Sequence, residues 1–135
     1  MDLECRVAVT LVSTMLTDST VECSLLYTTE DPYAVHMRFP PVDSFTKPVV
    51  WSFSRELLNL GLDEPSGLGD VRLRPCVGDR LVVSLRGSTG DATLALRTSR
   101  LRRFLEDSEL LVPSGSEAEF IDWDHVAHQL TSPTP

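Results

Sequence analysis

Seven separate stretches of this sequence alternate apolar and polar side chains one residue at a time. Because successive side chains of a β-strand point to opposite faces, this alternation is typical of strands that bury one face and expose the other. Short segments rich in Gly, Pro, Asp, Ser and Thr separate the stretches, as expected for turns between neighbouring strands. The alternation predicts seven strands, within 3–12, 20–27, 33–39, 47–54, 71–76, 80–86 and 92–96.

Helices are expected where this alternation stops. Ser54 can accept a hydrogen bond from a free backbone N–H and so cap a short helix. Gly61 is expected to end this helix by adopting a left-handed conformation. A longer helix with one apolar stripe is predicted over 99–113, followed by a linker at 115–119 and a last helix capped by Asp122. The sequence therefore predicts an α+β fold, with about seven antiparallel strands in twisted sheets and helices at the C-terminal end.

The length of 135 residues is that of one domain. We predict that 1–131 form this single domain and that 132–135 form a disordered tail. No apolar run approaches the roughly 20 residues that cross a bilayer, and the acidic N-terminus differs from the basic start of a signal peptide. A cytoplasmic protein that does not insert into a membrane is therefore expected.

Motifs that carry catalysis or bind cofactors are missing from the sequence. There is no Gly-x-Ser-x-Gly elbow, no phosphate-binding Gly-Lys-Ser/Thr and no Cys-x-x-Cys pair. Cys5, Cys23 and Cys76 stand alone on strand positions, which is typical of small buried side chains in a reducing compartment. His125 and His128 are too loosely arranged for a zinc site and are expected to be solvated. We therefore expect no enzymatic activity, no metal and no cofactor.

The net charge of −8 is unevenly distributed along the chain. Residues 104–135 contain seven Asp and Glu and no Lys or Arg, whereas 1–103 contain all 12 basic side chains and are nearly neutral. A net-acidic chain repels phosphate backbones as a whole, although a local group of arginines can still attract them. Nucleic acid is therefore not expected as the main partner.

Four arginines cluster at the start of the predicted long helix, and they are Arg97, Arg100, Arg102 and Arg103. Arginine binds carboxylates through two parallel hydrogen bonds, so one interpretation is a contact site for an acidic partner. The other interpretation is a solvated face whose arginines pair with acidic side chains of the body. The sequence leaves both open.

A second set of arginines projects from the polar positions of the fifth and sixth predicted strands, and its members are Arg72, Arg74, Arg80 and Arg86. Such a row can follow a phosphate backbone, which makes it the alternative, nucleic-acid-binding face. Proteins that bind single strands usually add aromatic side chains on which the bases stack. The strand aromatics all fall on apolar positions, which favours a core role for Tyr33, Phe39, Trp51 and Phe53.

Three blocks of residues, taken together and in this order, resemble the SsgA-like proteins of actinobacteria. The blocks are Tyr27 with 31–35 and Phe39, then Trp51, Phe53, Arg55, Glu56, Leu57, Leu58 and Gly61, and finally Gly67, Gly69, Asp70, Val71, Arg72 and Pro75. With the hairpin and the C-terminal helices, the resemblance covers nearly the whole chain.

This resemblance implies a non-enzymatic regulator of sporulation-specific cell division. In one branch of the family, members help to bring the tubulin-like protein FtsZ to the septum, and others act later in septal and spore-wall peptidoglycan remodelling. The family fold is described as similar to the whirly-type single-strand-binding proteins, with a trimeric assembly. The resemblance thus implies a homo-oligomeric scaffold at the septum that binds division proteins and other SsgA-like proteins. A single-stranded nucleic-acid binder is the alternative, by fold analogy alone.

Overall fold

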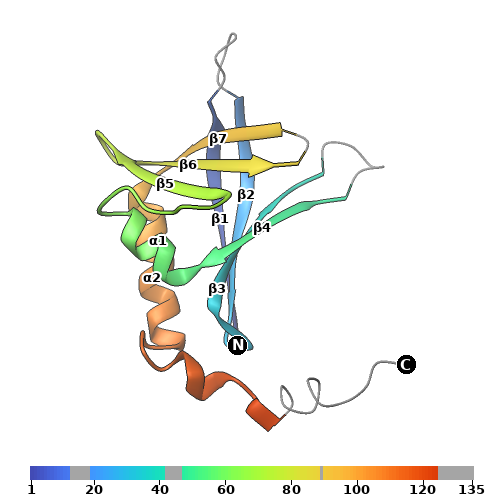
Figure 1. Ribbon diagram of the computed structural model, residues 1–135, viewed down its shortest axis with the longest axis vertical. Helices are drawn as coiled ribbons and strands as arrows, with labels where there is room; N and C mark the ends of the chain where they lie inside the picture. Colours follow the sequence, from blue (N-terminus) through green and yellow to red (C-terminus); the bar gives the residue numbers. More distant parts are fainter. Residues whose placement is uncertain (13–18, 42–46, 89, 125–135) are drawn as a thin grey trace.

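The computed structural model describes residues 1–12, 19–41, 47–88 and 90–124 (Figure 1). The strands are β1 (Asp2–Leu11), β2 (Ser19–Thr28), β3 (Asp31–Phe39), β4 (Val49–Ser54), β5 (Val71–Cys76), β6 (Arg80–Gly87) and β7 (Gly90–Leu96). The helices are α1 (Arg55–Gly61), α2 (Thr98–Leu111) and the short 3-10 helix η1 (Glu117–Phe120). All seven predicted strands and the long helix are present, so the predicted α+β fold is confirmed.

The strands form one curled antiparallel sheet, in the order β4-β3-β2-β1-β7-β6-β5. β1 and β2 pair along their whole length, but β1 and β7 pair only through Thr10–Ala95 and Leu11–Leu94. This short contact divides the sheet into two wings, β4-β3-β2-β1 and β7-β6-β5, which run in clearly different directions in Figure 1. β4 and β5 are the two outer strands.

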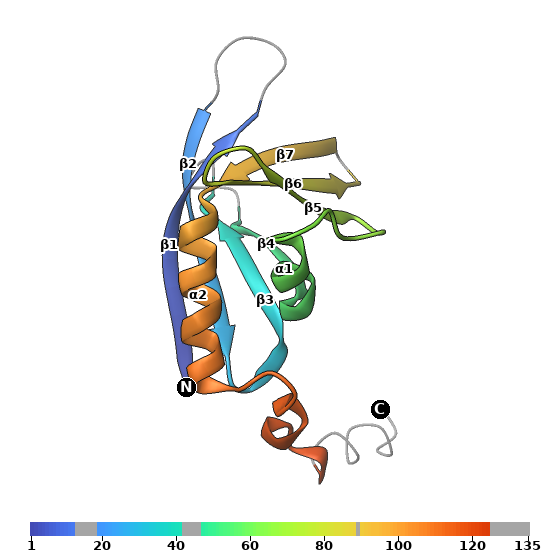
Figure 2. The same ribbon diagram turned by 90° about the vertical axis from the view of Figure 1, so that its left-hand side faces the viewer.

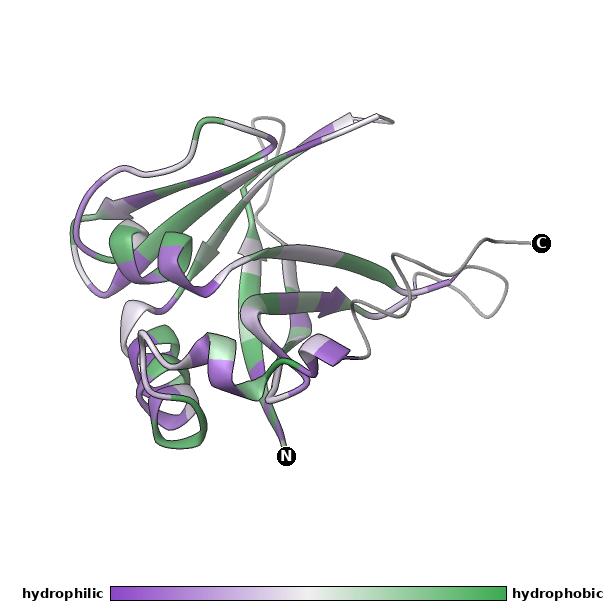
Figure 3. Cartoon of the chain, turned by 60° about the horizontal axis from the view of Figure 1, so that its bottom comes forward, coloured by the Kyte–Doolittle hydropathy of each residue, from purple (hydrophilic) through white to green (hydrophobic). Residues whose placement is uncertain are grey.

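α1 and α2 lie on the same side of the curled sheet (Figure 2). Leu101, Phe104 and Leu105 of α2 are buried with the inward side chains of both wings. Figure 3 shows the matching bands of hydrophobic and hydrophilic residues along the strands and on α2. The predicted apolar stripe of α2 is confirmed with one addition: Ser108 is buried on the same face, and its hydroxyl donates to the Leu105 carbonyl at 2.7 Å.

α1 begins as predicted and ends differently. The Ser54 hydroxyl accepts a hydrogen bond from the Leu57 N–H at 2.9 Å, which confirms the cap. Gly61, however, belongs to the helix and does not adopt the left-handed conformation. A Cβ at this position would lie 2.5 Å from the Cβ of Leu73, so glycine is required because β5 passes so close to α1.

The assignment of Tyr33 to the inner face of β3 is wrong. Tyr33 is 48% exposed and its neighbour Pro32 is buried. The pairing of β2 with β3 shifts between Leu26 and Thr28, so β3 carries extra residues there and its inward and outward positions exchange. The Tyr27 hydroxyl donates to the Pro32 carbonyl at 2.8 Å and holds this irregularity in place.

Two expectations for the C-terminal end have different outcomes. The predicted linker at 115–119 is wrong in part, because η1 begins within it at Glu117. Trp123 and Asp124, directly after Asp122, are helical, and the rest of the last predicted helix lies outside the described residues. The predicted tail and the domain boundary also lie outside the described residues.

Cys23 is buried as predicted, whereas Cys5 and Cys76 are half-buried. Burial, with smaller contributions from Cys5 and Glu22, raises the pKa of the Cys23 thiol from 9.0 to about 12. Because the thiolate is the reactive form, its fraction near pH 8 is lower by about 1,000-fold than that of an ordinary thiol.

We therefore expect iodoacetamide to modify Cys5 and Cys76 well before Cys23 in the native protein. Mass spectrometry of the modified peptides measures the order. All three thiols should react at similar rates once the protein is unfolded in urea, which is the control. Equal rates in the native protein would contradict the burial of Cys23.

Candidate functional site

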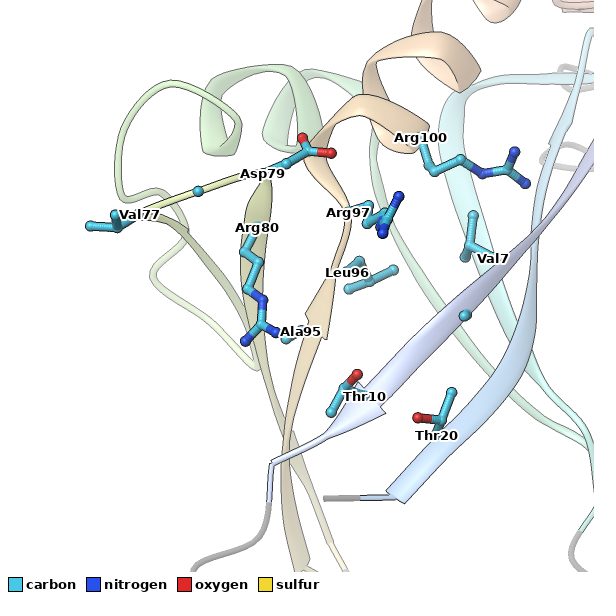
Figure 4. Close-up of a pocket in the computed structure, with 12 residues that line it drawn as sticks. Val7, Thr10, Thr20, Val77, Asp79, Arg80, Ala95, Leu96, Arg97 and Arg100 are labelled. Carbon is cyan, nitrogen blue, oxygen red and sulfur yellow. The ribbon is translucent and has the colours of Figure 1, made fainter. Parts of the chain in front are cut away.

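Arginines from both predicted sets meet in one pocket of about 890 Å³, which we call the arginine pocket. Arg80 comes from the start of β6, and Arg97 and Arg100 come from the junction of β7 with α2 and from the first turn of α2. Figure 4 shows the three side chains around the hollow between the two wings. The sequence placed Arg80 with the strand arginines and Arg97 and Arg100 with the helix arginines, so it is the fold that brings these three side chains together.

The sheet register explains how these residues converge. Leu81 of β6 pairs with Leu96 of β7, which places the preceding Arg80 close to the following Arg97. α2 starts directly after β7 and brings Arg100 toward β1. Beyond their short contact β1 and β7 separate, and the pocket occupies the space between them.

Arg100 is held in position by the main chain of β1. Its Nη2 donates to the carbonyl oxygen of Arg6 at 2.6 Å and lies 3.8 Å from the Sγ of Cys5. A guanidinium has five N–H donors, so most of them remain available after this bond. Arg100 therefore stands at the pocket in a fixed place with donors to spare.

Among the described residues that line the pocket, Asp79 is the one acidic residue, and it caps α2. Its carboxylate accepts hydrogen bonds from the Ser99 hydroxyl at 2.5 Å and from the Ser99 N–H at 2.8 Å. These two bonds, with the nearby charges of Arg97 and Arg102, lower the pKa of Asp79. Asp79 is thus ionised and engaged with the start of the helix.

The pocket carries an excess of positive charge. Within the described part of the chain, no carboxylate lies within 4.0 Å of the guanidinium groups of Arg80, Arg97 or Arg100. Glu22 lies opposite the pocket residue Ala8 in the register of β1 and β2, but its carboxylate forms an ion pair with Arg6 at 3.7 Å. Among the described lining residues, three guanidinium groups against one engaged carboxylate leave a net charge of about +2 to attract an anion.

The other two helix arginines lie outside this pocket. Arg102 donates to the Asp63 carboxylate at 3.1 Å, an exposed pair of the kind the solvated interpretation expected. Arg103 is exposed and is not among the residues that line the pocket. The two sequence interpretations therefore apply to different members of the set.

The remaining strand arginines lie on the outward face of β5 and β6. Arg72, Arg74 and Arg86 are all exposed. Arg72 and Arg86 line a small hollow of about 220 Å³ together with Asp70 and Asp91, so carboxylates offset their charge. This arrangement weakens the row as a track for phosphates.

Aromatic side chains for base stacking are not found on this face. The exposed aromatics of the described residues are Tyr33, Phe120 and Trp123, and none of them belongs to β5, β6 or β7. The predicted core role is confirmed for the other strand aromatics, which lie in or against the core and are Phe39, Trp51 and Phe53.

A second charged cluster was missed from the sequence. Arg55 is only 3% exposed, and its guanidinium donates to the carbonyl of Val112 at 2.7 Å and to Glu117 at 2.7 Å. It also contacts Ser108 and lies 5.0 Å from the centre of the Tyr27 ring. Arg55 thereby ties the start of α1 to the end of α2 and to η1. In the sequence, the only feature that singled out Arg55 was its place in the second block of residues shared with the SsgA-like proteins.

No metal or membrane-spanning element is found in the part of the chain that the structure describes. No group of three or more His, Cys, Asp or Glu side chains there is arranged to hold a metal ion. None of the described helices is long and apolar enough to cross a membrane. His125 and His128 lie outside the described residues.

Comparisons with known proteins agree on one family. A family model described as "Streptomyces sporulation and cell division protein, SsgA" matches residues 21–117. The sporulation-specific cell division protein SsgB of Salinispora tropica is 40% identical, over 95% of this chain and 92% of its own. SsgB of Streptomyces coelicolor is 36% identical, over 90% of each chain.

Two solved structures share the fold. The SsgA-like sporulation-specific cell division protein of Thermobifida fusca superposes with a TM-score of 0.82 at 30% identity, over 96% of each chain. A structure from a study of SsgB mutations that correlate with longitudinal cell division in Streptomyces coelicolor has a TM-score of 0.81 at 32% identity, over 89% of this chain and 95% of that one. The chain therefore belongs to the SsgA family of sporulation and cell division proteins.

Proposed function

We propose that this protein acts in sporulation-specific cell division as a non-enzymatic scaffold that helps to recruit or position FtsZ at the division septum. The similarity to SsgB proteins over almost the whole chain supports the process. The observation that carries the proposed role is the arginine pocket, because it presents guanidinium groups that have no carboxylate partner among the described residues, on an otherwise acidic protein. The role requires binding and no chemical step.

We further propose that the scaffold works as a homo-oligomer, with a trimer as the assembly to test, and that it also contacts other SsgA-like proteins. The two outer strands differ in a way that supports self-association through one of them. β5 carries Arg72, Arg74 and Pro75, which discourage pairing with a further strand. β4 has no charged residue and exposes Val49 and Val50, so it is the edge better suited to pairing.

Co-sedimentation with FtsZ polymers tests the recruiting role. We expect the purified protein to pellet with FtsZ polymers at low salt, less so at moderate salt, and to leave a labelled single-stranded oligonucleotide unbound. Binding of the oligonucleotide alone would replace the proposal with the nucleic-acid alternative. Binding of neither would overturn FtsZ recruitment and favour the later-acting role in septal and spore-wall peptidoglycan remodelling.

A further inference from the structure

We propose that the arginine pocket binds an extended acidic segment of a partner protein, with side-chain carboxylates of that segment paired to Arg80, Arg97 and Arg100. This inference rests on the proposed function only for the identity of the partner as a division protein. The class of ligand follows from the pocket itself.

The charges in the pocket select an anionic ligand. None of its three guanidinium groups has a carboxylate partner within the described residues, and Asp79 is occupied by the two Ser99 hydrogen bonds. Guanidinium groups match carboxylates in a planar geometry with two parallel bonds, and such pairs are among the stronger hydrogen bonds in proteins. A segment with several carboxylates satisfies more than one of these arginines at once.

The shape of the pocket fits a peptide segment. Its volume of about 890 Å³ lies in the upper part of the range of binding clefts, roughly 300–1,000 Å³. Thr10 and Thr20 line the side opposite the arginines and offer hydroxyl groups. Val77, which is fully exposed in the turn between β5 and β6, adds an apolar contact at the rim.

The distribution of charge over the protein sets the direction of approach. Five of the seven acidic residues that follow Arg103 lie on α2 and η1, which lead away from the start of α2 in Figure 1. Acidic ligands are therefore repelled by this end of the molecule and attracted at the N-terminal end of α2. Salt should weaken binding, because it screens the local attraction between the pocket arginines and an acidic ligand.

A peptide segment fits these features better than a phosphate backbone. A single strand of nucleic acid needs a continuous basic groove and stacking platforms. Arg72 of β5 and Arg86 of β6 share a hollow with Asp70 and Asp91, which offset their charge, and no exposed aromatic is described on these strands. The hydroxyl groups of the pocket and its apolar side chains, among them Val7, Val77 and Leu96, suit a polypeptide.

The test uses the full chain and a rhodamine-labelled oligo-Glu peptide, with oligo-Gln as the matched uncharged probe, in fluorescence anisotropy. The pocket variant is Arg80→Glu with Arg97→Glu. Its matched control is Arg86→Glu with Arg103→Glu, which has the same net charge and changes β6 and α2 outside the pocket. Arg100 is left intact because it also bonds to β1.

We expect oligo-Glu to bind, oligo-Gln not to bind, and the pocket variant to weaken oligo-Glu affinity by about tenfold or more, against less than about twofold for the control. Equal weakening by both variants, or equal binding of both peptides, would overturn the inference. An Arg80→Gln, Arg97→Gln variant with an unchanged melting temperature repeats the test if the charge-reversed chain is poorly folded. If the pocket variant no longer self-associates but still binds oligo-Glu, the pocket would be a contact site for a second copy of this chain, and the inference would also be overturned.

The two proposals fail separately in this design. If the wild-type protein binds oligo-Glu but does not pellet with FtsZ, the pocket stands and the recruiting role falls. If it pellets with FtsZ but does not bind oligo-Glu, the recruiting role stands and the pocket inference falls.

Discussion

Replacing Arg55 by alanine will lower the free energy of unfolding by about 3–5 kcal/mol, the range for removing one partner of a buried ion pair. The side chain of Arg55 is 4% exposed and that of Glu117 is 16% exposed, so little water is available to replace the lost bonds. The carbonyl of Val112 and the carboxylate of Glu117 would both lose the hydrogen bond from Arg55, and the end of α2 and η1 would lose their tie to α1.

Urea unfolding of the two proteins measures this effect. The matched control is Arg38→Ala, because Arg38 pairs with Glu4 at 3.4 Å in an exposed position, where such a pair contributes about 0–1 kcal/mol. Arg55→Lys should fall between wild type and Arg55→Ala, since a single ammonium does not reach Val112 and Glu117 in the fork geometry of a guanidinium. A loss below about 1 kcal/mol for Arg55→Ala would contradict the structural role of this cluster.

The effect of Arg55 should also depend on pH. Desolvation opposes ionisation of Glu117, but hydrogen bonds from the Gly115 N–H and from Arg55 lower its pKa below the ordinary 4.5. A carboxyl whose pKa is lower in the folded state adds stability above its unfolded pKa and loses it as pH falls through the folded value. The difference between wild type and Arg55→Ala should therefore shrink below about pH 4.5.

Replacing Gly61 by alanine will destabilise the protein by about 1–3 kcal/mol, even though alanine is the better helix former. The added Cβ would stand 2.5 Å from the Cβ and 2.6 Å from Cδ1 of Leu73, a side chain that is 1% exposed and held in the core. Propensity would contribute a gain of about 0.8–1.0 kcal/mol, which the overlap with a packed strand should exceed.

Thermal or urea unfolding tests this sign. Gly69→Ala is the control, because a Cβ there would meet nothing within 4 Å, and it should be neutral or slightly stabilising. Adding Leu73→Ala to Gly61→Ala should cost less than the sum of the two single changes, since the smaller side chain removes the contacts with Cγ and Cδ1 and leaves only the contact with the Cβ. A stabilised Gly61→Ala protein would show that α1 moves away from β5 at little cost.

The local alternation and spacing of residues determined the strands, the buried face of α2 and the family of this protein. Residue-by-residue alternation predicted each strand to within a few residues, because the side chains of a strand must face either the core or water. The hydroxyl of Ser54 and the spacing of Leu101, Phe104 and Leu105 predicted the start of α1 and the buried face of α2. The blocks of turn and apolar residues identified the family, since these residues are the ones that the fold requires.

Where the expectations failed, the deciding partner lay far away in the chain. Gly61 was interpreted from its place at a helix end, but Leu73 of another element decides its role. Tyr33 faces water because the pairing of β2 with β3 shifts nearby. Arg55 resembled an ordinary first-turn residue, and only the packing of α2 and η1 over it makes it a buried cation.

The candidate site depended on tertiary structure most of all. Composition and spacing sorted the arginines into a helix set and a strand set, and neither set is the pocket. The pairing of Leu81 with Leu96 brings Arg80 to Arg97, and the early separation of β1 from β7 opens the space that they surround. The sequence thus determined which residues are charged and which elements they occupy, whereas strand order and register decided which charges meet, because neither is encoded in any local pattern.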